Sequence, residues 1–75
     1  MKLKPIPYRK ILALLEELGY VPARQKGSHL ILQNKDGKLV VVPIHLKDIG
    51  VGLVREIIRE LGMTRAEFLE KLERM

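Results

Sequence analysis

The chain has no cysteine and no tryptophan, and it holds a single phenylalanine among its 75 residues. Without cysteine, the protein can form neither a disulfide framework nor a cysteine–zinc site. No apolar run approaches the roughly 20 residues that a membrane-spanning helix needs. The first residues, MKLKPIPYRK, lack the apolar segment of a secretory signal. We therefore expect a cytoplasmic protein with no membrane segment.

Metal ligands are also scarce. The chain has two histidines, and its carboxylates are scattered along the sequence. Asp36 and Asp48 fall in expected turns, where we interpret them as solvated. A metal site usually gathers three or four ligands, so the sequence predicts neither a metal site nor a cofactor.

Hydrophobic residues make up 47% of the chain, and aliphatic side chains dominate among them. This composition and the length predict one small folded domain covering residues 1–75. The net charge of +5 is unevenly spread. Residues 1–47 carry nine Lys/Arg against three Asp/Glu, whereas residues 48–75 carry five against six. A basic half favours a polyanionic partner, usually nucleic acid; the alternative is that the charge serves only solubility.

Three helices are expected from apolar spacings of three and four residues. The first covers about residues 7–18, with Gly19 after its end. The second carries Leu53, Val54, Ile57, Ile58 and Leu61 on one stripe and stops at Gly62. The third is short and opens with Thr64 and Glu67, the spacing of a capping box. Its apolar residues should pack on the body of the domain.

Between the first two helices, β-branched and aliphatic runs separated by turn signals predict three antiparallel strands, near residues 20–25, 28–34 and 38–44. Pro22 and Pro43 have no N–H donor, so each should lie at a strand end, an edge or a bulge. Three strands cannot bury both faces alone, so the helices must cover one face. The expected fold is an α+β two-layer sandwich in the order α-β-β-β-α, with an extra short helix at the C-terminus.

Alternation along the strands sets which way the two histidines point. Leu30 and Leu32 suit the covered face of the second strand, which turns His29 to the open face. The stretch NKDG fits a three-residue hairpin loop with Gly37 in the left-handed conformation. That loop pairs Leu32 with Val40 and Leu30 with Val42, and it turns His45 to the open face as well. A two-residue loop would reverse this parity.

The tripeptide Gly27-Ser28-His29 is a candidate site. Glycine lets a phosphate approach the backbone closely, and Ser28 and nearby N–H groups are hydrogen-bond donors. Lys26 and Arg24 add positive charge on the same surface. An imidazole can act as acid or base near neutral pH, so His29 could deprotonate a ribose 2′-OH. The alternative is that the two histidines are unrelated surface residues.

Taken together, the stretches ILALLEELGYVPARQKGSHLILQNKDG, VVVPIH and VGLVREIIRELGMT resemble the HicA toxins of toxin–antitoxin systems, the YcfA-like mRNA interferase family. The resemblance implies a fold like a double-stranded-RNA-binding domain (dsRBD-like). It also implies a metal-independent endoribonuclease that cleaves mRNA and is restrained by a cognate HicB antitoxin. The family's catalytic histidine matches His29, within a motif that includes Gly27 and Ser28. His45 matches a frequent histidine of the V-P-x-H stretch, and we assign it to RNA binding.

Two positions depart from the family pattern. Many relatives carry a second histidine directly after G-S-H, where this chain has Leu30; its place on the expected core face explains an apolar residue. Relatives often begin the second helix with Lys-Pro-Gly-Thr, where this chain has Gly50-Val51-Gly52-Leu53. Contact between this helix start and RNA phosphates should be weaker here, and we expect Lys47 to compensate.

Two other functions fit the sequence. A non-catalytic module could dock on duplex RNA through shape and phosphate contacts, with His29 as a mere contact. A small interaction protein could use the basic face to hold an acidic partner. We favour the toxin, with mRNA as its substrate.

Overall fold

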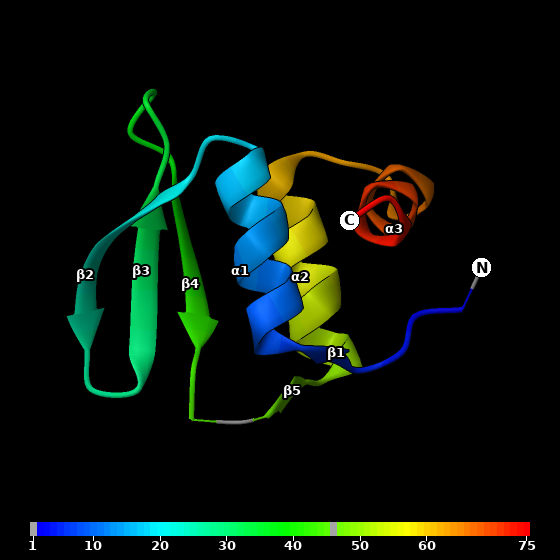
Figure 1. Ribbon diagram of the computed structural model, residues 1–75, viewed down its shortest axis with the longest axis horizontal. Coiled ribbons are helices and arrows are strands. Elements are labelled where there is room, and N and C mark those ends of the chain that lie inside the picture. The colour runs from blue at the N-terminus through cyan, green and yellow to red at the C-terminus, as the bar shows by residue number, and fades with distance from the viewer. Residues whose placement is uncertain (1, 46) are drawn as a thin grey trace.

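The computed structural model describes residues 2–45 and 47–75. Its main sheet is three-stranded, antiparallel and ordered β2-β3-β4. Two of the helices, α1 and α2, contact β4 and cover one face of this sheet, while α3 packs on their far side (Figure 1). The strands are β2 (Val21–Lys26), β3 (His29–Gln33) and β4 (Leu39–Pro43), and the helices are α1 (Tyr8–Glu17), α2 (Val51–Leu61) and α3 (Arg65–Glu73). The predicted α+β fold, of the dsRBD-like α-β-β-β-α type, is confirmed.

The core lies between the helices and the covered face of the sheet. Side chains from all three helices and from the strands are nearly inaccessible to solvent, and no polar or charged residue among those described is buried with them. The interior is therefore held by apolar burial, worth about 25 cal/mol per Å². The fully buried side chains are Ile11, Leu14, Leu15, Leu32, Val40, Val42, Ile49, Val54, Ile57 and Phe68.

The helix ends follow local signals in the sequence. At the end of α1, the N–H groups of Gly19 and Tyr20 donate to the carbonyls of Glu16 and Leu15, at 3.0 and 2.9 Å. This pair of bonds is a Schellman motif. At the start of α3, Thr64 and Glu67 form the predicted capping box. The Thr64 N–H bond to the carboxylate holds the pKa of Glu67 below its ordinary value.

Two short strands were not predicted. β1 (Ile6–Pro7) and β5 (Asp48–Ile49) form a separate two-stranded antiparallel sheet in which Ile6 faces Ile49. Each has two residues, too few to show an alternating pattern. The pairing joins the entry to α1 with the entry to α2, and the N–H of Tyr8 donates to the carbonyl of Lys47 at 3.1 Å.

The β3–β4 hairpin has the predicted three-residue loop. The N–H of Asn34 donates to the carbonyl of Lys38, and Gly37 has a φ of +82°, the left-handed region that favours glycine. The side-chain oxygen of Asn34 accepts bonds from the N–H groups of Asp36 and Lys38, at 3.0 and 2.8 Å. The loop pairs Leu32 with Val40 and Leu30 with Val42, so the predicted register is confirmed.

Candidate functional site

The uncovered face of the main sheet carries three rows of side chains, because directly paired residues share a face. At the turn end, Lys26, His29 and Pro43 form one row, in which Lys26 and His29 are exposed and Pro43 is buried. The next row holds Arg24, Ile31 and Val41, and the last holds Val21, Gln33 and Leu39. Cations and a histidine therefore stand at one end of this surface, which we call the open face.

The far end of the open face is apolar. Val21, Leu39 and Val41 are 58%, 52% and 40% exposed, unusually high for such side chains. Val21 reaches this face because the register of β2 shifts between Pro22 and Arg24, which makes Ala23 an extra, bulged residue. Pro22 lies at this bulge and Pro43 is the last residue of β4; both are on edge strands, as predicted.

A two-residue turn, Gly27-Ser28, joins Lys26 to His29. Its length makes these two residues direct partners and so decides which residues of β2 and β3 share a face. Gly27 has a φ of +60°, while Ser28 does not have a positive φ, which is the pattern of a type II′ turn. Both turn carbonyls are occupied. The Gly27 carbonyl accepts from the Gln25 side-chain amide at 2.9 Å, and the Ser28 carbonyl accepts from the Ile44 N–H at 2.7 Å.

The turn also offers donors and space. Within the described part of the chain, the N–H groups of Gly27 and Ser28 have no hydrogen-bond partner. A Cβ built on Gly27 would meet no atom within 4 Å, so the backbone is open to a ligand. Free N–H groups beside cations form a suitable cradle for a phosphate.

The two histidines come together on this face. Their ring centroids are 6.1 Å apart, their planes are tilted by 57°, and both side chains are exposed. Lys26, the direct cross-strand partner of His29, is exposed too; Cβ atoms of such pairs lie about 4.5–5.5 Å apart. An imidazole that is free in solvent beside a cation can exchange protons with a bound substrate.

Of the predicted site residues, the structure brings Lys26, Gly27, Ser28, His29 and His45 to the turn end of the open face, with Arg24 in the adjacent row. Lys47 is exposed, and its backbone is tied to the start of α1 rather than to the sheet. Leu30 faces Gln25 and Val42 on the covered side, half-buried against the core. This position explains why the chain has an apolar residue where relatives carry a second histidine.

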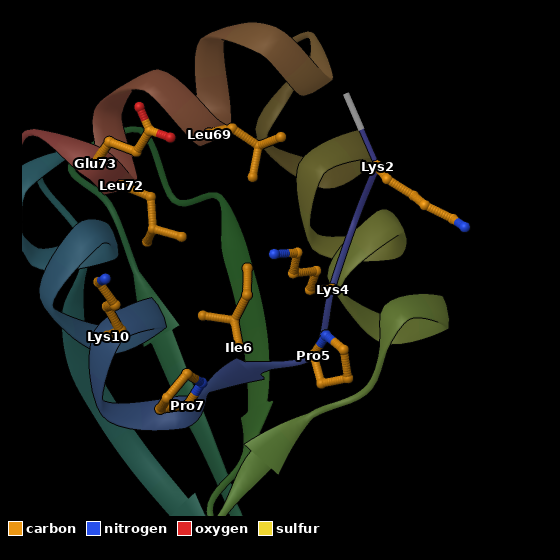
Figure 2. Close-up of a pocket in the computed structure, with 9 residues that line it drawn as sticks. All are labelled: Lys2, Lys4, Pro5, Ile6, Pro7, Lys10, Leu69, Leu72 and Glu73. Atoms are coloured by element: carbon orange, nitrogen blue, oxygen red, sulfur yellow. The ribbon is translucent and has the colours of Figure 1, made fainter.

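The surface also has a groove away from the open face. A groove of about 360 Å³ opens between the N-terminal segment and α3, on the side of the helices away from the sheet (Figures 1 and 2). Leu69, Leu72 and Ile6 are apolar residues of its lining, and Lys4 and Lys10 add positive charge to it (Figure 2). Sequence reasoning missed this groove because it depends on how two chain ends meet. It contains neither histidine, so we place the candidate site on the open face.

The positive φ of Gly27 predicts that a substitution at this position changes the free energy of unfolding. Gly27→Ala should destabilise the protein by about 1–2 kcal/mol, because an L-residue is strained at a φ of +60°. Gly52→Ala is the matched control: Gly52 lies in the first turn of α2 with open space around it and no positive φ, so alanine should be neutral or stabilise by up to about 1 kcal/mol. Urea unfolding followed by circular dichroism measures both. Equal effects of the two substitutions would contradict the turn geometry.

Comparisons with known proteins point to one family. A family model described as the HicA toxin of bacterial toxin-antitoxin matches residues 8–63, from the start of α1 to just past α2. No curated protein gives a significant match.

In the described ranges 2–45 and 47–75, no helix has the length and apolarity to cross a membrane. The same ranges hold no group of three or more His, Asp or Glu side chains placed to bind a metal ion.

Proposed function

Because the chain belongs to the HicA toxin family, we propose that it is an endoribonuclease that cleaves mRNA, with His29 as the general base. The observation that carries the proposal is the exposed ring of His29 on the open face, directly across from Lys26 and next to the Gly27-Ser28 turn. This arrangement joins a proton acceptor, a cation and free N–H donors at one point.

The proposed reaction is attack of a ribose 2′-OH on the adjacent phosphorus. His29 takes the 2′ proton as the new O–P bond forms, and the bond from phosphorus to the 5′ oxygen breaks. The leaving 5′ oxygen takes up a proton from a donor at the site or from water, so the products are a 2′,3′-cyclic phosphate and a 5′-hydroxyl. All of this chemistry uses groups of the chain, the RNA and water, so we propose cleavage without a metal.

The neighbouring residues would hold the RNA. Lys26 and Arg24 stand in adjacent rows and neutralise phosphates, as cations generally do in nucleic-acid complexes. The N–H groups of Gly27 and Ser28 would bind oxygens of the reacting phosphate. Lys47 would contact a phosphate farther along the strand, near the start of α2.

Membership of the family implies a cognate antitoxin. We propose that a HicB-like protein covers the open face and so blocks access to His29. The exposed Val21, Leu39 and Val41 would give it an apolar contact, and the cations at the turn end would attract acidic side chains.

Expression in cells tests the function. The parent chain, induced without an antitoxin, should arrest growth and fragment mRNA, whereas His29→Ala should do neither. Fragments from the parent should end in a 2′,3′-cyclic phosphate, and the purified protein should still produce them in EDTA. Equal toxicity of the two chains would reject His29 as the base. RNA binding without any cleavage by the parent would favour the non-catalytic module.

A further inference from the structure

We propose that His45 is a second catalytic residue: the general acid that protonates the leaving 5′ oxygen while His29 acts as base. This inference rests on the proposed ribonuclease function. It starts from the pair of exposed imidazoles, whose ring centroids are 6.1 Å apart on the open face.

The backbone holds the two rings together. Pro43 is paired directly with His29, and His45 lies two residues farther along the same segment. Between them, the N–H of Ile44 donates to the carbonyl of Ser28 at 2.7 Å, which ties this segment to the turn before His29. Pro43 is itself buried and has a restricted φ. The proximity of the rings therefore depends on main-chain pairing that joins the end of β4 to the Gly27-Ser28 turn.

The reaction needs two proton transfers on opposite sides of phosphorus. The 2′-OH loses a proton as its oxygen bonds to phosphorus, and the 5′ oxygen gains one as its bond to phosphorus breaks. A neutral imidazole accepts the first proton, but it has none to donate to the leaving group at the same moment. A second, protonated imidazole removes this conflict. In one turnover His29 gains a proton and His45 loses one, and exchange with water restores both.

The spacing suits one phosphodiester. A catalytic acid or base must come within about 2.6–3.2 Å of the oxygen it serves. With their centroids 6.1 Å apart, the two rings are close enough for each to reach a different oxygen of one phosphodiester. The rings are tilted by 57° rather than stacked and both are exposed, so both are accessible to a bound RNA.

Other groups on this face are poorer proton donors. Arg24 and Lys26 are the other cations of this face. A guanidinium is in general too weak an acid to donate a proton, and an ammonium is a weaker acid than an imidazolium. Both are better suited to neutralising phosphate charge, so the geometry leaves His45 as the acid.

The test changes the leaving group. One substrate is an RNA oligonucleotide containing a site that the parent chain cleaves; the other is the same RNA with sulfur in place of the 5′ oxygen at that site. Because a thiolate leaves without being protonated, it needs no general acid. His45→Ala and His45→Gln should each slow cleavage of the natural RNA at least about 10²-fold. On the sulfur substrate, each should cleave within a few-fold of the parent rate.

Two control variants make the result specific. His29→Ala should be slow on both substrates, because the base is needed for either leaving group. Lys26→Ala should slow both equally, as expected for a loss of phosphate contact. His45 variants that cleave natural RNA at the parent rate, or that are equally slow on both substrates, show that His45 is not the general acid. Either result leaves the ribonuclease function standing. A parent chain that cleaves neither substrate overturns the ribonuclease function itself.

Discussion

Purified protein carrying His29→Ala should cleave RNA about 10²–10⁴-fold more slowly than the parent chain, because a positioned acid–base group contributes that much to a proton transfer. The fold should survive, since the ring is exposed and has no hydrogen-bond partner among the described residues. RNA binding should survive too, because Lys26 and Arg24 remain on the face. Single-turnover cleavage of end-labelled RNA in EDTA measures the rate, and a filter-binding assay measures the affinity.

The matched control for this substitution is Gln33→Ala. Gln33 lies on the same strand and the same face as His29, two rows away, and it is exposed. Its removal should change the cleavage rate by a few-fold at most. If Gln33→Ala and His29→Ala lower the rate equally, the loss reflects a disturbed surface rather than missing proton transfer. If neither lowers it, His29 is not the base.

Much of the fold could be predicted because its local signals agree with one another. The apolar stripes of α1 and α2, the capping box of α3 and the Asn34–Lys38 loop each specify one element. The loop mattered most, because its length decides the parity of β4 and so the face on which His45 stands. The β1–β5 pairing was missed because it depends on contacts between distant segments that have no periodic pattern.

The candidate site was only partly predictable. Alternation along β3 turns His29 away from the core, and the Gly27-Ser28 turn then fixes Lys26 as its partner. The sequence did not reveal how close the two imidazoles lie, because that depends on the Ile44 bond to the Ser28 carbonyl. Nor did it reveal the bulge at Ala23, which turns Val21 outward.

The second large effect concerns stability. Phe68→Ala should cost about 3–5 kcal/mol, because removing a buried aromatic ring loses its burial energy and leaves a cavity. Phe68 is the only phenylalanine in the chain and is fully buried. A domain of this size has a total stability of roughly 4–11 kcal/mol. The substitution should therefore unfold a substantial fraction of the protein, as measured by urea denaturation or a thermal melt.

This prediction tests whether α3 belongs to the cooperative domain, since α3 lies beyond the residues that the family model matches. Lys71→Ala, on the exposed side of the same helix, should change the free energy of unfolding by less than about 0.5 kcal/mol. If Phe68→Ala costs no more than Lys71→Ala, α3 docks too weakly to support the core. A large cost would show that α3 belongs to the same cooperative unit as α1, which contacts both α3 and β4. α1 packs against β4, the strand that leads to His45. Phe68→Ala should then also lower RNA cleavage at temperatures where the parent stays folded.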